Sequence, residues 1–238
     1  MLNSKPLELV SKAKLSSVLI LDNDGYPIAS GSVVEVSKRK WCIITNKHVL
    51  NINRPIQICL NFLTGAQCFE ATILTSHPTL DLVAIVPIKH QLPPFPLVNM
   101  ILRKAFASKE EIKEGLPIFH IGYPLGLGAE EYNYPLVRRG IVAQVMPKHS
   151  DFLIDSVASP GNSGSGVFSA TEGKFFGIIS GYLKDFSYFS DDGALLGTPV
   201  QVNSGLAIVI SAPSVKKMFS DYVLKRIRSR LKKVKKAL

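Results

Sequence analysis

Residues 156–168 read SVASPGNSGSGVF and place three glycines around one serine, Ser163. Glycine is used where the backbone makes a strained turn, or where another group must approach the backbone closely. A serine hydroxyl is a weak nucleophile that needs a neighbouring base and an anion-stabilising pocket before it reacts. The stretch therefore predicts an activated serine, and the rest of the sequence has to supply its partners.

The surrounding sequence has the pattern of an all-β protein. Short apolar runs rich in Val, Ile, Phe and Thr alternate with turn-forming breaks such as DNDGYP at 22–27. Many short strands at this spacing favour a barrel or a sandwich. A proline-containing and polar stretch, 89–116, interrupts the series and is the expected connector between two lobes. The runs lie at 16–21, 30–36, 41–45, 56–62, 69–74, 82–88, 117–123, 136–145, 152–157, 165–168, 175–183 and 204–210.

A helix at the C-terminal end, over 213–238, is the clearest helical signal. Apolar residues recur there in steps of three and four, from Val215 to Leu238, which places them on one stripe. Pro213 and Ser214 stand at its start, where both residue types are favoured. A shorter helix is expected over 5–14.

The positive charge of the chain is concentrated in that C-terminal helix. The formal net charge is +10, and ten of the 28 Lys and Arg residues lie in 213–238 beside a single acid, Asp221. The rest of the chain is therefore nearly neutral. Three hypotheses stay open for the basic segment 225–238. It could be a solvated helix end, contact an anionic membrane surface, or contact nucleic-acid phosphates. The oligomeric state stays open as well.

The three cysteines and the N-terminal residues bear on the compartment. Cys42, Cys59 and Cys68 are odd in number and lack paired spacing, which predicts no disulfide framework and a reducing environment. The longest early apolar run, 18–21, is too short for a signal-peptide core or a membrane span. We expect a cytoplasmic protein, with peripheral membrane association left open. No clustered ligands suggest a metal, and no cofactor is expected.

A hydrolytic serine needs a histidine to take its proton and a carboxylate to orient that histidine. His48 follows an apolar run in IITNKHVL, and Asp81 stands at the entry to another run in TLDLVAIV. Each residue alone has a more common structural role, and His77 is a rival partner for Asp81. The chain order His48, Asp81, Ser163 is nevertheless one in which the catalytic triad occurs. We therefore predict this triad.

The glycines of the serine segment suggest the second requirement, an oxyanion site. The backbone N–H groups of Gly161 and Ser163 converge on one point only if the turn between them is tight. Asn162, which lies between them, is the third candidate donor. Backbone N–H groups aimed at a single point are the usual way to stabilise the negative charge that develops during acyl transfer.

Six motifs in this order resemble those of the trypsin-like serine proteases, and most closely the protease domain of the HtrA/Deg branch. They are TNKHV at 45–49, DLVAI at 81–85, GYPLGL at 122–127, RRGIVAQV at 138–145, PGNSGSG at 160–166 and SGLAIVIS at 204–211. The resemblance runs from about residue 30 to residue 223. It implies a protein or peptide substrate, cleaved through an acyl-enzyme.

The resemblance also implies the fold and its division along the chain. The expected fold class is all-β, with two six-stranded antiparallel β-barrels of the chymotrypsin type and a C-terminal α-helix. The N-terminal barrel would cover about 15–100, the C-terminal barrel about 117–212, and the helix 213–238, all in one protease domain. The sequence ends where the PDZ domain of that branch would begin, so we expect a protease domain without one.

The primary specificity pocket is likewise implied by the resemblance. Val157 would form its floor, Ser180, Gly181 and Tyr182 the edge strand that pairs with substrate, and Gly205 the opposite wall. An uncharged floor predicts a preference for small or medium apolar side chains at P1, the substrate residue before the cleaved bond. The rival hypothesis is a catalytically silent or latent barrel that binds peptides or partners.

Overall fold

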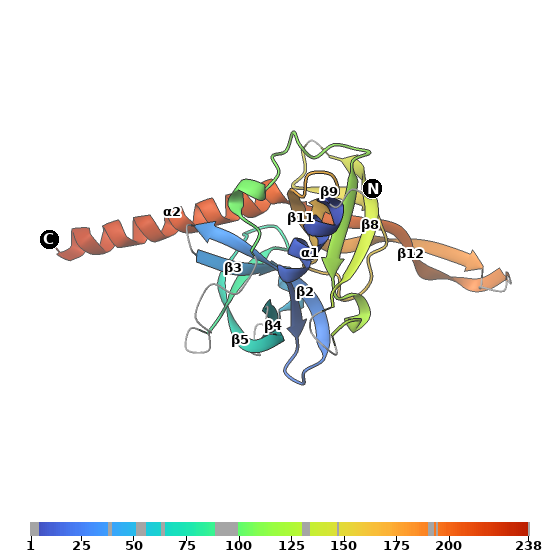
Figure 1. The fold of residues 1–238 in the computed structure, drawn as a ribbon, viewed down its shortest axis with the longest axis horizontal. Helices are drawn as coiled ribbons and strands as arrows, with labels where there is room; N and C mark the ends of the chain where they lie inside the picture. The colour runs from blue at the N-terminus through green and yellow to red at the C-terminus, as the bar shows by residue number, and fades with distance from the viewer. Residues whose placement is uncertain are drawn as a thin grey trace.

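The apolar runs form strands that close into two barrels, and a computed structural model shows how the barrels and helices are arranged (Figure 1). The structure describes residues 5–37, 40–50, 56–62, 65–88, 100–129, 134–146, 148–189, 193 and 195–237. The expected two six-stranded antiparallel barrels with a C-terminal helix are confirmed. Among the described residues, no helix combines the length and apolarity needed to cross a membrane.

The N-terminal barrel closes in the order β1-β2-β3-β6-β5-β4. Its first strand explains the contact between the two lobes, because all five of its residues are buried. Val18 and Ile20 point into the barrel core, while Leu19 and Leu21 pack outward against Tyr123 of the second lobe. The strands are β1 (Ser17–Leu21), β2 (Pro27–Ser37), β3 (Lys40–Thr45), β4 (Ile56–Phe62), β5 (Gly65–Ser76) and β6 (Val83–Pro87).

The C-terminal barrel closes in the order β10-β11-β12-β9-β8-β7. Its interior is filled by alternate residues of several strands, including Val142, Phe152 and Val167. The strands are β7 (Pro117–Gly122), β8 (Leu136–Val145), β9 (Asp151–Asp155), β10 (Gly166–Ser169), β11 (Phe175–Phe189) and β12 (Leu195–Ser211). Three short 3-10 helices, η1 (Lys47–Val49), η3 (Arg103–Ala105) and η4 (Pro124–Gly126), lie between strands.

A third apolar cluster joins the two barrels and anchors both helices. It combines residues of β2 and β3 with the aromatic side chains of Phe119, Phe168 and Phe175. The helix α2 (Ala212–Ala237) inserts Val215 and Phe219 into this cluster, which fixes its first turns against the barrels. Figure 1 shows the rest of α2 projecting away from the barrels. The expected short N-terminal helix is also confirmed, as α1 (Lys5–Leu15).

The side chains of 225–238 lie outside the described part of the chain. The membrane and nucleic-acid contacts proposed for that segment therefore stay predictions. The connector expected over 89–116 is described from residue 100 onward, and 89–99 lie outside the described residues. In the described part, Ile101 and Phe106 are buried and bridge to Val34 and Phe175. This part of the connector packs against both barrels.

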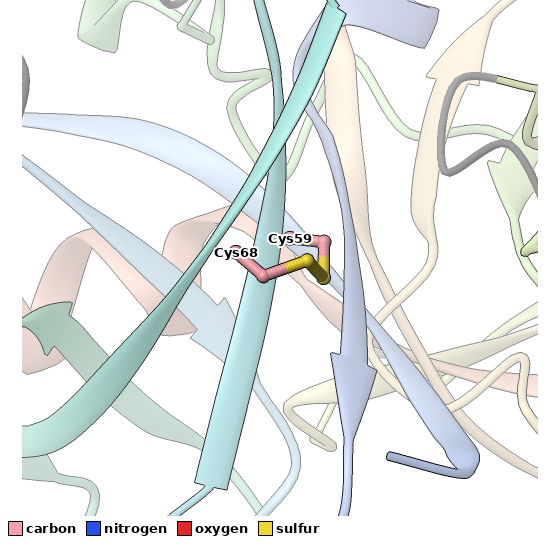
Figure 2. The surroundings of a disulfide bond; sticks show 2 residues. All are labelled: Cys59 and Cys68. Carbon is pink, nitrogen blue, oxygen red and sulfur yellow. A yellow bond between two sulfur atoms is a disulfide. The ribbon is translucent and has the colours of Figure 1, made fainter.

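The expectation that no disulfide forms is wrong. Cys59 on β4 and Cys68 on β5 are joined by a disulfide, shown in Figure 2. The two residues are direct partners in the antiparallel register of β4 and β5. Sequence spacing alone does not reveal this, because the register of a hairpin decides which residues face each other. Cys42 stays a free thiol inside the protein, and its burial raises its pKa.

The β11–β12 hairpin is longer than the sequence predicted. The apolar runs suggested strands over 175–183 and 204–210, but β11 continues to Phe189 and β12 begins at Leu195. The two strands remain paired from Lys184–Asn203 out to Phe189–Leu195. They form a two-stranded arm, residues 183–189 and 195–203, that projects from the barrels on the side opposite the free end of α2 (Figure 1).

Candidate active site

The structure brings His48, Asp81 and Ser163 together between the two barrels. His48 lies in η1, directly after β3, and Asp81 stands just before β6. Since β3 and β6 are hydrogen-bonded neighbours, the residues after one and before the other meet at the same edge of the barrel. Ser163 comes from the second barrel, on the loop that precedes β10. The three side chains therefore depend on three separate pieces of backbone.

The contacts among these three residues form one hydrogen-bonded chain. His48 Nδ1 lies 2.5 Å from Asp81 Oδ2, and His48 Nε2 lies 2.9 Å from Ser163 Oγ. The other Asp81 oxygen accepts the His48 backbone N–H at 3.0 Å. An ionised carboxylate only accepts hydrogen bonds, so Nδ1 carries the ring proton and donates a hydrogen bond to Asp81. Nε2 is then the unprotonated nitrogen, and it accepts the Ser163 hydroxyl.

The rival pairing of Asp81 with His77 does not occur. His77 Nδ1 instead accepts the backbone N–H groups of Thr79 and Leu80, at 3.3 and 3.0 Å. Burial is the main cause that lowers the pKa of His77, and the charge of Lys47 adds to it. His77 therefore caps the turn that leads to Asp81 and leaves the carboxylate to His48.

Two glycines of the serine segment are required by backbone conformation and by close packing against neighbouring backbone of both barrels. Gly161 has φ +91° and Gly164 has φ +86°, values that L side chains rarely adopt. A Cβ on Gly161 would overlap the carbonyl oxygen of Tyr123, and one on Gly164 would overlap the carbonyl oxygen of Ser30. Backbone conformation and contacts from outside the loop thus explain two of the three glycines, Gly161 and Gly164.

The turn leaves two backbone donors beside Ser163. Among the described residues, the N–H groups of Gly161 and Ser163 donate to no acceptor within the chain. The carbonyl of Pro160 is held by the N–H of Leu125 at 2.6 Å. Two unengaged N–H groups, on either side of Asn162 and beside the Ser163 hydroxyl, are the kind of donors that an oxyanion site requires.

Asn162 differs from the expectation that it is a third donor. Its backbone N–H donates to the Ser159 carbonyl at 2.9 Å. Its side chain is also engaged, because Oδ1 accepts the Ser159 N–H and Nδ2 donates to Ser165 Oγ. Asn162 is buried and stabilises the turn from within, so its own N–H is not available to a ligand.

Ser30, on β2 of the first barrel, supports the loop and was missed in the sequence. Its hydroxyl donates to the Gly161 carbonyl at 2.7 Å and accepts the Tyr123 N–H at 2.8 Å. Its backbone N–H donates to the Ser163 carbonyl at 2.9 Å. Ser30 is fully buried. Because these partners are about 90 to 130 positions away in sequence, no local pattern could have identified it.

A pocket of about 460 Å³ opens beside the triad. Ser180, Gly181 and Tyr182 line it together with His48 and Ser163, as expected. The remaining lining residues are Ala158, Ser159, Pro160, Asn162, Ile179 and Lys184. Among the described residues that line the pocket, Lys184, which the sequence had not singled out, is the only lysine or arginine, and none has a carboxylate.

Two predicted pocket residues do not line this pocket. The side chain of Val157 is 51% exposed, and its carbonyl accepts a hydrogen bond from Arg138 at 2.8 Å. Gly205 lies in β12, where its N–H donates to Asn203 Oδ1 and its carbonyl accepts the Ser156 N–H. Val157 was expected to form the floor of the pocket, but its neighbour Ala158 lines the pocket instead.

Comparison with known proteins agrees with this geometry. Residues 29–178, more than half of the chain, match the family model of the trypsin-like peptidase domain. The chain belongs to the trypsin-like peptidase family. It is thus placed among serine proteases, and the matched region contains all three members of the His–Asp–Ser cluster. No curated protein sequence matches the chain.

Solved structures with the same fold include bacterial proteases, one of them of the HtrA type. A serine endoprotease from Yersinia pestis is 19% identical, with a TM-score of 0.63, over 92% of this chain and 66% of that one. The apo MamO protease domain from Magnetospirillum magneticum is 16% identical, with a TM-score of 0.60, over 87% and 96%. An HtrA-type protease, AlgW, solved with a tripeptide, is 19% identical, with a TM-score of 0.62, over 89% and 61%. The chain thus spans about two thirds or less of the first and third of these.

Proposed function

We propose that this trypsin-like peptidase is a serine endopeptidase that hydrolyses peptide bonds through an acyl-enzyme. The single observation that carries the proposal is the hydrogen-bonded chain from Asp81 through His48 to Ser163, next to two unengaged backbone N–H groups. A nucleophile, an oriented base and an anion site within reach of one atom are the requirements of acyl transfer.

In the proposed reaction, Ser163 Oγ attacks the scissile carbonyl carbon while His48 Nε2 takes the hydroxyl proton. The N–H groups of Gly161 and Ser163 bind the oxygen that becomes negative in the tetrahedral intermediate. Removing one such donor typically costs about 3 kcal/mol of transition-state stabilisation. Asp81 keeps the imidazole in the reactive tautomer and stabilises the imidazolium that forms.

The intermediate collapses when the imidazolium gives its proton to the leaving amine and the C–N bond breaks. The acyl group is then an ester on Ser163. Water enters the same position, His48 takes a proton from it, and its oxygen attacks the ester carbonyl. The second tetrahedral intermediate releases the carboxylic acid and returns the proton to Ser163.

For the residue before the cleaved bond, we propose a preference for small or medium apolar side chains. Ala158, Ile179 and Tyr182 supply apolar lining to the pocket that Ser163 also lines. The lining residues that the structure describes include no carboxylate to attract Lys or Arg. An apolar pocket discriminates mainly by size, at about 1–3 kcal/mol per methylene.

The experiment that tests the proposed function is labelling with a fluorophosphonate probe, which reacts with activated serines. Labelling of the wild-type chain and its loss in Ser163→Ala are the expected results. Ser187→Ala changes a half-buried serine on the arm; it is the control and should label as the wild type does. A folded wild-type chain that does not label would favour the silent or latent binding module instead.

A further inference from the structure

The strand that lines the pocket continues into the arm with one edge free. β11 pairs with β10 only as far as Ile178, and it pairs with β12 along its other edge. From Ser180 to Phe189, no described strand pairs with the edge on the β10 side. Ten residues at about 3.3 Å each make this edge about 33 Å long. An unpaired edge of this length is a template for an added strand.

The arm has a defined face toward the pocket. Tyr182 and Lys184 both line the pocket beside Ser163. The pairing of β11 with β12 is regular from Lys184 to Ser187, so Phe186 lies on the same face as Lys184, and Tyr188 follows it two residues further along β11. Phe186 is 51% exposed and Tyr188 is 56% exposed. A two-stranded hairpin is marginally stable in water, and exposed aromatic side chains on it indicate a surface for contact.

Lys184 adds a charge to this face. Asn203, its partner across the hairpin, hydrogen-bonds through Nδ2 to the carbonyl of Ala158 on the pocket wall, which confirms the orientation of the face. Lys184 has no ion-pair partner in the described part of the chain. The neighbouring carboxylate of Asp185 belongs to the opposite face and accepts the Phe186 N–H. The ammonium group is therefore free to bind a carboxylate.

The family resemblance already assigns substrate pairing to Ser180–Tyr182. We propose that the free edge of β11 continues this pairing along the arm, where it binds the substrate segment upstream of P3 as an added antiparallel strand and selects its side chains. With P1 opposite Ser180, P3 lies opposite Tyr182, P5 opposite Lys184, P7 opposite Phe186 and P9 opposite Tyr188. The surface takes an unfolded polypeptide with a carboxylate at P5 and apolar side chains at P7 and P9. This inference rests on the proposed peptidase function for its direction, because P1 is defined by the cleaved bond.

Binding to the full-length Ser163→Ala chain tests the inference without cleavage. Fluorescent peptides that share one P3–P1 sequence are extended to P5 with Glu, then to P9 with Leu at P7 and P9, and their affinity is measured by anisotropy. The affinity should increase with each extension. Phe186→Ser and Tyr188→Ser should each reduce the affinity of the long peptide about tenfold, because each removes the apolar area that one aromatic ring would bury against the peptide.

The charge and the face have separate controls. Lys184→Glu should reverse the preference for Glu over Lys at P5, by about threefold to fivefold in each direction for an exposed pair. Val202→Ser changes an exposed side chain of the opposite face, across from Asp185, and should leave peptide affinity as it was. Equal affinity for short and long peptides overturns the inference. So does a Val202→Ser loss as large as that of Phe186→Ser.

Probe labelling of the wild-type chain separates this inference from the proposed function. If Ser163 is labelled and short and long peptides bind with equal affinity, the peptidase function is supported and the arm is not a substrate-binding surface. If Ser163 is not labelled but the long peptide binds tightly and loses affinity in the Phe186→Ser and Tyr188→Ser variants, the arm is a binding surface and the proposed peptidase function is wrong.

Discussion

His120 on β7 allows a quantitative test of how burial of a titratable side chain changes the pH dependence of stability. Its side chain is 1% exposed, and its Nε2 lies 3.0 Å from the hydroxyl of Ser156. Burial is the main cause that lowers its pKa from 6.5 to about 4, the charge of Arg138 adds to this, and a backbone contact with Val157 opposes it. The folded protein thus keeps His120 neutral at pH values where the unfolded chain is protonated.

The sign and size of the effect on stability follow from this pKa difference. As the pH falls below 6.5, the unfolded chain binds a proton that the folded chain does not, so the free energy of unfolding decreases. The decrease is complete once the pH is below about 4. At about 1.4 kcal/mol for each pH unit between the two pKa values, the contribution of His120 is about 3 kcal/mol.

Replacement by His120→Gln removes the titration and keeps an amide that can bond to Ser156. Urea unfolding between pH 4 and pH 8, in the Ser163→Ala background to prevent self-cleavage, should show about 3 kcal/mol less loss of stability on acidification for the Gln variant. His149→Gln is the matched control, because the side chain of His149 is 61% exposed. Its pH dependence should follow that of the parent. Parallel curves for parent and His120→Gln would refute the reasoning.

Two further predictions concern the contacts that hold the site and the barrel. Ser30→Ala leaves the Gly161 carbonyl and the Tyr123 N–H without their partner, so the free energy of unfolding should fall by about 1–3 kcal/mol. The kcat for a peptide substrate should also fall, about tenfold or more, with a smaller change in KM. Thermal unfolding and steady-state kinetics measure the two effects, and lower stability with unchanged kcat would contradict the positioning role. Reduction of the Cys59–Cys68 disulfide, which closes a separation of nine residues, should lower the free energy of unfolding by about 2–3 kcal/mol; denaturant unfolding with and without reductant checks this, and a double Ala variant should not respond to reductant.

Much of the fold and the core of the site could be predicted because they follow from local patterns. Each apolar run became a strand, since period-2 burial and turn residues act over a few positions. The same holds for the start of α2 at Ala212, one residue before the expected Pro213. The cluster of His48, Asp81 and Ser163 was also predictable, because each residue stands at the end of a recognisable strand-like run.

The errors lie where the outcome depends on which strands meet. The pairing of Cys59 with Cys68 depends on the register of β4 and β5, and neither the odd cysteine count nor the spacing contains that information. Val157 was expected in the pocket, but the turn after β9 exposes it and Ala158 takes the place beside Ser163. Asn162 was expected as a donor, but the same turn uses its N–H internally.

The sequence by itself determined the all-β class, the two lobes, the terminal helix and the three residues of the hydrogen-bonded chain. Each of these follows from the periodicity of apolar residues or from the residues next to a strand-like run. Only the tertiary structure decided that Ser30 carries the serine loop, that Lys184 enters the pocket and that β11 continues as an arm with a free edge. These features arise from contacts between segments far apart in the chain, or from which edge of a strand stays unpaired. Chain closure into barrels fixes such contacts, and no local pattern specifies them.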